Sequence, residues 1–188
     1  ISTPVRSAPF GSRSPAPPMD FVKISAIAVN PVDYKIRQRV SPEKGTSKVL
    51  GWDAVGEIVA VGSEVQQFNV GDRVFYAGDL TRQGSNAEYQ LVDERIVGNA
   101  PSSLSDSDAA ALPLTTITAW ELVFEHLAIK KQPVGKVEKT DDLVLVVGAA
   151  GGVGSVMLQL LKQLTGATVI ATASRDSSKA WVERLGAD

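Results

Sequence analysis

Short hydrophobic runs separated by polar and glycine residues dominate the first half of the chain. Phe21–Val29 predicts a strand that stops at Asn30-Pro31, and residues 32–39 predict a short helical turn. Further short strands with tight turns are predicted over residues 52–76, and another strand or pair of strands over residues 87–97. This part is therefore expected to be mainly β, as a barrel or a sandwich.

The pattern changes to helical spacing after residue 103. Helices are predicted over 106–111, where Ser105 or Asp106 can cap, and from Pro113 to about Leu127. A polar connector, residues 130–142, precedes alternating elements: strand 143–147, helix 152–164, strand 168–173 and helix 177–185. This β-α-β-α order predicts the start of a parallel, doubly wound sheet. Two parallel strands cannot cover both their faces, so we expect this second domain to be incomplete here.

Residues 1–20 differ in composition from the rest of the chain. Residues 1–18 hold five of the ten prolines, four serines and two arginines, and no acidic residue precedes Asp20. We expect a flexible leader, with a targeting segment as the alternative. The predicted domains are then a leader at 1–20, a β domain at 21–110, and the N-terminal half of a nucleotide-binding domain at 111–188.

Bulk composition excludes several classes of protein. A net charge of −2 gives no electrostatic reason to expect nucleic acid or an anionic membrane as a partner. No apolar run approaches the roughly 20 residues that span a bilayer. The absence of cysteine excludes disulfides, thiolate catalysis and cysteine-ligated zinc sites. These features fit a cytoplasmic location.

A glycine cluster follows the apolar run Leu143–Val147 and opens the next predicted helix. The residues expected to hold a pyrophosphate are Ala150, Gly151, Gly152, Val153 and Gly154. Gly151 would let the backbone approach the ligand and Gly154 would let the helix pack on the strand, while Ala149 replaces the usual first glycine. The alternative is a tight β-α turn without a ligand.

The end of the second strand predicts which nucleotide binds. An NAD site usually carries an acidic residue about 20 positions downstream, to bind the ribose 2′-hydroxyl. Here Ser174 and Arg175 occupy that place and Lys179 follows one turn into the helix. A hydroxyl and two cations suit a 2′-phosphate, so we predict NADP(H). The alternative is a helix cap at Ser174 or Ser177 with solvated charges.

Several spaced motifs together resemble the medium-chain dehydrogenase/reductase superfamily. They are Asn30-Pro31-Val32-Asp33-Tyr34, Gly51-Trp52-Asp53-Ala54-Val55-Gly56 continuing to Gly62, Gly71-Asp72-Arg73-Val74, Ala109–Thr115, and Ala149–Gly154. They resemble in particular its quinone oxidoreductase-like branch, often labelled zinc-type alcohol dehydrogenase-like. The resemblance implies a GroES-like β-barrel domain, a Rossmann cofactor domain, hydride transfer between them, and a homodimer or homotetramer.

The metal site of the zinc-dependent members is missing from the motifs. Trp52 stands where those members carry a histidine ligand, and His126 is the single histidine of the chain. One imidazole without cysteines cannot build a catalytic zinc site, so we predict no metal.

Without a Lewis acid, hydride transfer suits quinones and α,β-unsaturated carbonyls, whose incoming charge is delocalised. The resemblance places Asn30 and Tyr34 beside the nicotinamide or the substrate, with Tyr34 as the candidate donor to an oxyanion, and Thr118 against the nicotinamide. Trp52 and Asp53 are expected to line the pocket. Tyr34 and Trp52 could instead be packing residues, and Asn30 could simply start a turn.

We therefore predict an NADPH-dependent reductase of quinones, enones or aldehydes. Two alternatives stay open. The first is a non-catalytic NADPH-binding or structural protein, since relatives include lens crystallins and nucleic-acid binders. The second is an enoyl reductase domain of a larger synthase, which would act on acyl-carrier-linked substrates.

Overall fold

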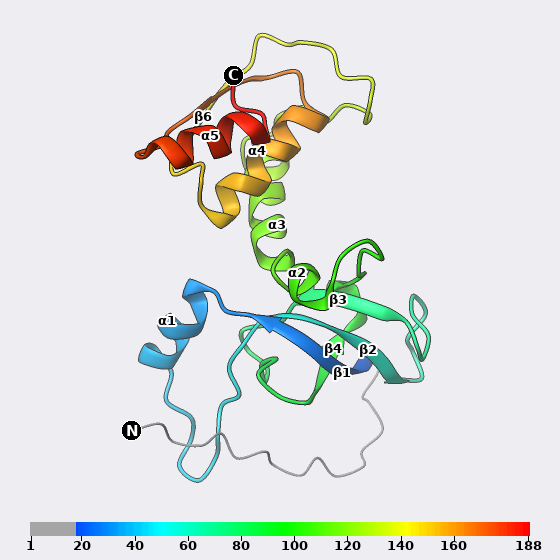
Figure 1. Ribbon diagram of the computed structural model, residues 1–188. Coiled ribbons are helices and arrows are strands. Elements are labelled where there is room, and N and C mark those ends of the chain that lie inside the picture. The colour runs from blue at the N-terminus through cyan, green and yellow to red at the C-terminus, as the bar shows by residue number, and fades with distance from the viewer. Residues whose placement is uncertain (1–17) are drawn as a thin grey trace. The chain divides into compact units, whose positions relative to one another are not determined.

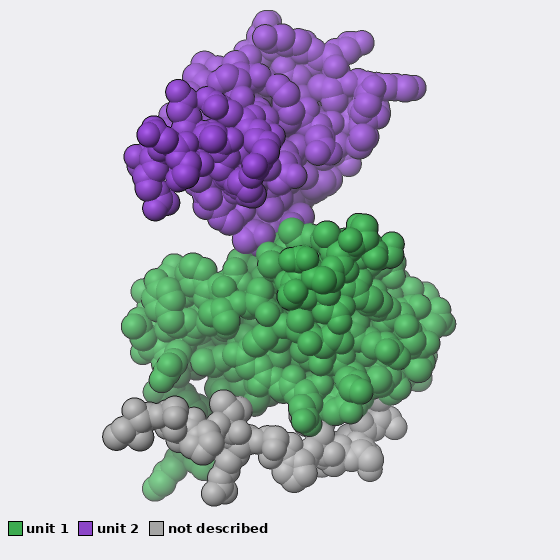
Figure 2. Space-filling view, viewed as in Figure 1, with its two compact units in different colours: residues 1–114 green, residues 115–188 purple. Residues whose placement is uncertain are grey.

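The computed structural model describes residues 18–188 and divides the chain into two compact units (Figures 1 and 2). Unit 1 ends at Leu114 and unit 2 runs from Thr115 to Asp188. Residues 1–17, most of the expected leader, lie outside the described residues. Met19 and Asp20 were expected in the leader but form the start of the first strand.

Unit 1 is built on one five-stranded antiparallel sheet. The strands are β1 (Met19–Ala28), β2 (Asp53–Val61), β3 (Arg73–Ala77), β4 (Tyr89–Asp93) and β5 (Val97–Asn99), in the spatial order β4-β1-β2-β3-β5. The helical segments are α1 (Pro31–Arg39), the 3₁₀ turn η1 (Glu94–Ile96) and α2 (Asp106–Ala110). Within the described residues the outer strands β4 and β5 do not pair with each other. The antiparallel sheet agrees with the β domain expected here, and its closure into a barrel stays a prediction.

Alternating side chains bury both faces of the central strand β2. Ala54 and Ile58 lie in one fully buried cluster with Val22 and Val74, because residues two or four apart on a strand share a face. Val55 points to the opposite face and packs on the two alanines of α2, Ala109 and Ala110. The small side chains of α2 allow this close approach. Arg73 holds α2 in place with two hydrogen bonds to Asp106, of 2.9 and 2.7 Å.

Unit 2 has the predicted β-α-β-α order. α3 (Pro113–Trp120) continues into a π-helical segment, η2 (Glu121–His126), and then follow β6 (Leu143–Val146), α4 (Gly152–Leu164), β7 (Thr168–Ala171) and α5 (Asp176–Leu185). β6 and β7 pair in parallel, with Leu143 opposite Thr168 and Val146 opposite Ala171. The single helix expected from Pro113 to Leu127 therefore changes its hydrogen-bonding pattern after Trp120.

One face of the two-stranded sheet packs in the core of unit 2. Val144 and Val146 are buried with Leu158 and Leu161 of α4, whereas Leu143 is 65% exposed on the opposite face. The alternation along β6 is the usual consequence of pleating. Among the described residues, no helix has the length and hydrophobicity to cross a membrane.

Candidate functional site

The first candidate cluster lies where β1, β2 and α3 begin or end, within unit 1. Asn30 follows β1 and precedes Pro31, which starts α1 because its fixed φ suits a first helical position. The Asp33 carboxylate accepts the backbone N–H of Asn30 at 2.7 Å, which holds the chain entering the helix. The local sequence thus fixes the Asn30 backbone at the end of β1.

Asp53 is the centre of this cluster. Its side chain is 0% exposed, one carboxylate oxygen accepts Nδ2 of Asn30 at 2.8 Å, and the other accepts the backbone N–H of Leu114 at 2.8 Å. Burial raises the pKa of Asp53 to about 6, and the nearby Asp33 carboxyl also raises it, while the two hydrogen bonds act in the opposite direction. The carboxylate is therefore held by donors while its charge is poorly solvated.

The other residues predicted for this site lie in different environments. Trp52 is 1% exposed, and its indole Nε1 has no hydrogen-bond partner. Tyr34 lies on α1 and is 54% exposed. The structure thus brings Asn30 and Asp53 together, buries Trp52 as part of the core, and leaves the Tyr34 ring accessible.

Sequence reasoning did not include the backbone of Leu114 in this cluster. The sequence does indicate that Leu114 is a possible donor: Pro113 has no N–H, so Leu114 is the first residue of α3 whose backbone can donate a hydrogen bond. The acceptor that it meets, Asp53, is 61 residues away in the chain, and only the fold could show that pairing.

The second candidate cluster is the glycine turn between β6 and α4, within unit 2. Gly148 has a positive φ of 68°, and its carbonyl accepts the N–H of Gly151 at 3.0 Å. Gly151 precedes the first turn of α4, whose leading N–H groups have no partner within the helix. A Cβ on Gly154 would lie 2.6 Å from Cα of Ala149, so only glycine allows this approach of α4 to the turn.

These features fit a pyrophosphate. Gly151 and Gly152 are exposed, so a ligand can reach the backbone there, while Gly154 is buried against the turn. The free N–H groups and the positive end of the 13-residue helix α4 favour an anion at this place. Of the other residues predicted to hold the cofactor, Ala150 and Val153 are half-buried beside the turn.

The residues predicted to bind a 2′-phosphate follow β7. The Thr172 hydroxyl accepts the N–H of Gly148 at 2.9 Å, which joins the chain leaving β7 to the glycine turn. Ser174 and Arg175 come next and are exposed. Because β6 and β7 are parallel, their carboxyl ends lie at one edge of the sheet, where α/β proteins bind nucleotides.

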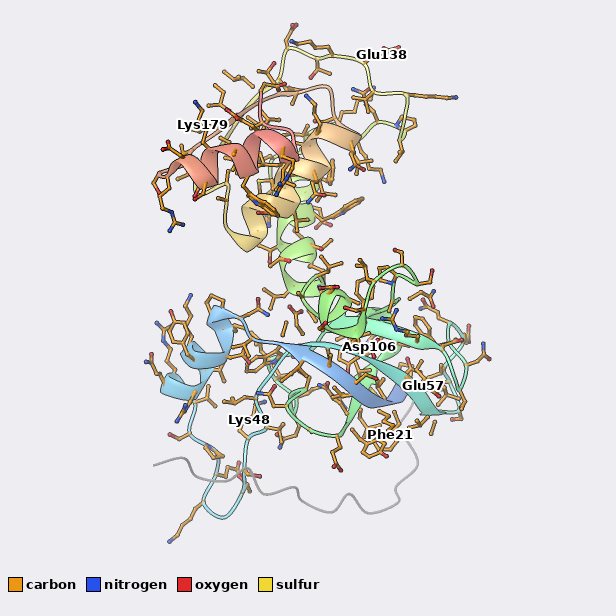
Figure 3. The ribbon with its side chains drawn as sticks, in the orientation of Figure 1. Phe21, Lys48, Glu57, Asp106, Glu138 and Lys179 are labelled. Carbon is orange, nitrogen blue, oxygen red and sulfur yellow. The ribbon has the colours of Figure 1, made fainter. Side chains whose placement is uncertain are left out.

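Lys179 lies on α5 and is exposed (Figure 3). Its ammonium group is 4.0 Å from the carboxylate of Glu183, a loose ion pair one turn along the helix. Thr118 is half-buried on α3 in unit 2. Thr172 is thus the residue after β7 that contacts the glycine turn, and Ser174 and Arg175 follow it in the chain.

A cavity of about 800 Å³ in unit 1 is lined by residues of the segments 40–49 and 81–91. It includes none of the residues predicted for the site. In residues 18–188, no group of three or more His, Cys, Asp or Glu side chains is placed to hold a metal ion.

An antiparallel β unit followed by a parallel strand–glycine turn–helix unit is an arrangement typical of the two-domain dinucleotide-dependent dehydrogenases and reductases. Comparisons with known proteins agree. Residues 20–102 match the alcohol dehydrogenase GroES-like domain. A zinc-type alcohol dehydrogenase-like protein of Staphylococcus aureus is 47% identical over 181 residues, which is 95% of this chain and 52% of that protein.

Solved structures give the same result. One of a zinc-dependent alcohol dehydrogenase protein from Rhizobium etli superposes with a TM-score of 0.81 at 48% identity, covering 94% of this chain and 50% of that one. The Escherichia coli quinone oxidoreductase, complexed with NADPH, superposes with a TM-score of 0.74 at 29% identity, covering 96% of this chain and 52% of that one.

The chain belongs to the medium-chain dehydrogenase/reductase superfamily, a family of oxidoreductases, with the zinc-type alcohol dehydrogenase-like and quinone oxidoreductase-like proteins. It spans about half the length of the curated relatives that it matches, 52% in the example from S. aureus.

Proposed function

We propose that this protein is part of a zinc-independent, NADPH-dependent oxidoreductase that transfers hydride to quinones or α,β-unsaturated carbonyls. The observation that carries the proposal is the glycine turn at the carboxyl edge of β6 and β7, with Ser174 and Arg175 following β7. Names of relatives agree with the reaction class. A 2-methylene-furan-3-one reductase of Solanum lycopersicum is 37% identical over 179 residues, 89% of this chain and 42% of that protein.

The cofactor would be held by groups of unit 2. The backbone N–H groups of Gly152, Val153 and Gly154 would bind the pyrophosphate, because they lie in the first turn of α4, and Ala150 and Gly151 would lie beside it in the turn. Ser174, Arg175 and Lys179 would bind the 2′-phosphate, Arg175 by a forked, charge-assisted contact. Thr118 would contact the nicotinamide side. When bound, NADPH supplies the hydride.

The residues of unit 1 supply the proposed substrate contacts. The Tyr34 hydroxyl is exposed and is the candidate donor to the oxyanion or enolate that forms as the hydride arrives. Asn30, held by Asp53, is the second residue proposed to lie beside the nicotinamide or the substrate. The proposal contains no zinc site, because the sequence has no cysteine and one histidine, and Trp52, at the place where zinc-dependent relatives are expected to carry a ligand, is buried in the core.

The cofactor assignment is tested by replacing Arg175 with aspartate in the full chain. Titration calorimetry with NADPH and with NADH measures both affinities. We expect at least a tenfold loss for NADPH, about 1.4 kcal/mol or more, and a much smaller change for NADH, because only NADPH carries the 2′-phosphate. Lys136→Asp is the matched control, since Lys136 is exposed in the connector and the charge change is the same. Equal losses for both cofactors would contradict the assignment.

Turnover is tested by following NADPH oxidation with a small quinone and with an enone. Tyr34→Phe removes the proposed donor and leaves the ring, so kcat is expected to fall at least tenfold. Binding of NADPH without turnover of any quinone, enone or carbonyl would favour the non-catalytic alternative. Turnover of acyl-carrier-linked substrates alone would favour an enoyl reductase domain.

A further inference from the structure

We propose that Asp53 is a positioning residue: its buried carboxylate fixes the direction in which the Asn30 amide faces and ties that amide to the first turn of α3. The inference deepens the proposed function, on which it rests for the statement that Asn30 meets a ligand. It differs from the expectation that Asp53 itself lines the pocket, because Asp53 is 0% exposed.

The amide direction follows from the chemistry of its partner. An ionised carboxylate can only accept hydrogen bonds, so the Asn30 atom that lies 2.8 Å from it must be the donor Nδ2. The amide oxygen Oδ1 then faces away from Asp53. Asn30 is half-buried, and its side chain also faces the backbone N–H of Asp33 in a capping box at the start of α1. The side of Asn30 away from Asp53 therefore carries an acceptor with two lone pairs, one of which would remain for a ligand hydroxyl or amide N–H.

Asp53 also caps α3 from outside that helix. Pro113 opens α3 without an N–H, and the N–H of Leu114 donates to the second carboxylate oxygen at 2.8 Å. A carboxylate at a helix N-terminus is stabilised by the positive end of the helix. One buried side chain thus joins the end of β1, the start of β2 and the start of α3, all within unit 1.

The charge state of Asp53 controls this arrangement. The influences on its pKa are burial and the Asp33 carboxyl on α1, which raise it, and the donors Asn30 and Leu114, which lower it, with the result at about 6. A protonated Asp53 could donate to Oδ1, so the Asn30 amide would be free to turn by 180°. The direction of the amide is then expected to depend on pH in the range where Asp53 titrates.

The test uses the full chain labelled with ¹⁵N at its four asparagines, Asn30, Asn69, Asn86 and Asn99. We expect the Asn30 side-chain protons to shift with pH, with a midpoint near 6, and one of them to exchange slowly with solvent above that pH. In Asp53→Asn this titration should disappear, whereas in Asp53→Glu, which keeps a carboxylate, it should persist. Asn69 serves as the internal control for folding.

Two results would overturn the proposal. One is an Asn30 amide signal that does not move with pH in the wild-type chain, a measurement that needs no variant to fold. The other is an Asn30 titration that survives unchanged in a folded Asp53→Asn protein.

A kinetic measurement separates this inference from the proposed function. If the wild-type chain reduces a quinone with NADPH, Asp53→Asn should lower kcat about tenfold with a smaller change in KM, because a misplaced group reduces the rate of the chemical step. Asp53→Asn should also remove the inflection near pH 6 from the pH profile of kcat. Adding Asn30→Ala to Asp53→Asn should lower kcat little further. An unchanged profile would count against positioning by Asp53. If a protein that spans the full length of its relatives binds NADPH but turns over nothing, the proposed function fails, and the amide titration of the present chain still decides the role of Asp53.

Discussion

Asp20 allows a quantitative prediction of how stability depends on pH. Its side chain is 0% exposed on β1, and neither carboxylate oxygen has a hydrogen-bond partner among residues 18–188. Burial, followed by the negative charges of Glu94, Asp72 and Asp93, raises its pKa from 3.8 to about 6. Buried carboxylates usually have donors or a cation, so this group destabilises the fold when it is ionised.

The sign and the size of this pH dependence of stability follow from the difference in proton binding between the folded and unfolded states. A group with a higher pKa in the folded state binds its proton more tightly there, so its contribution to stability is present below pH 3.8 and is lost as the pH rises through about 6. A pKa difference of about 2 corresponds to about 3 kcal/mol in the limit. Between about pH 4.5 and about pH 8 the loss from Asp20 should be about 2 kcal/mol, since part of the change lies below that range.

The perturbation is Asp20→Asn, which removes the titration at nearly constant volume. Urea unfolding is followed by the fluorescence of Trp52, the tryptophan of unit 1, with Trp120 and Trp181 replaced by phenylalanine in all proteins. The variant should be more stable than the parent by about 1 kcal/mol at about pH 4.5 and by about 3 kcal/mol at about pH 8, so that the difference grows by about 2 kcal/mol between them. Asp53 titrates in both proteins, so its contribution cancels in the difference.

Glu64→Gln is the matched control, because it makes the same change of net charge at an exposed position. The reasoning would be refuted if Asp20→Asn and the parent lost stability in parallel as the pH rises. It would also be refuted if Glu64→Gln gave the same difference as Asp20→Asn, since that would show a general charge effect.

Further predictions concern unit 2. Gly154→Ala should weaken NADPH binding and lower the free energy of unfolding, because its Cβ would meet backbone atoms of Ala149 at 2.6 to 2.8 Å; calorimetry and urea unfolding measure both. Gly148→Ala should lower the free energy of unfolding by about 1 kcal/mol because of the positive φ of 68° alone, since a Cβ added there would meet nothing within 4 Å. A larger loss of stability for Gly148→Ala than for Gly154→Ala would contradict this. Trp181→Phe should cost about 1 kcal/mol, because it removes the 2.8 Å hydrogen bond from the indole Nε1 to the Ser155 hydroxyl, and Ser155→Ala should then add little.

Local signals predicted the elements of unit 2 well. The apolar run before Gly148, the glycine cluster and the helical spacing after it lie within a few residues of one another, and the observed β6, α4, β7 and α5 follow them closely. Such a unit depends on neighbouring residues, so its pattern is readable in the chain. The change to a π-helix after Trp120 was not predicted, because η2 is only six residues long and the hydrophobic spacing of so short a segment does not distinguish the two helix types.

The sequence by itself determined the family, the order of elements and the residue types at the glycine turn, because each depends on motifs that are contiguous in the chain. Only the tertiary structure decided the roles of Asp53, Trp52 and Asp20. The Asn30–Asp53 and Asp53–Leu114 contacts span 23 and 61 residues, and Trp52 is buried just before β2 by packing against groups distant in the chain. A register shift of one residue would turn Asp20 on β1 and Asp53 on β2 to the opposite face of the sheet, so no local pattern could specify which groups they meet.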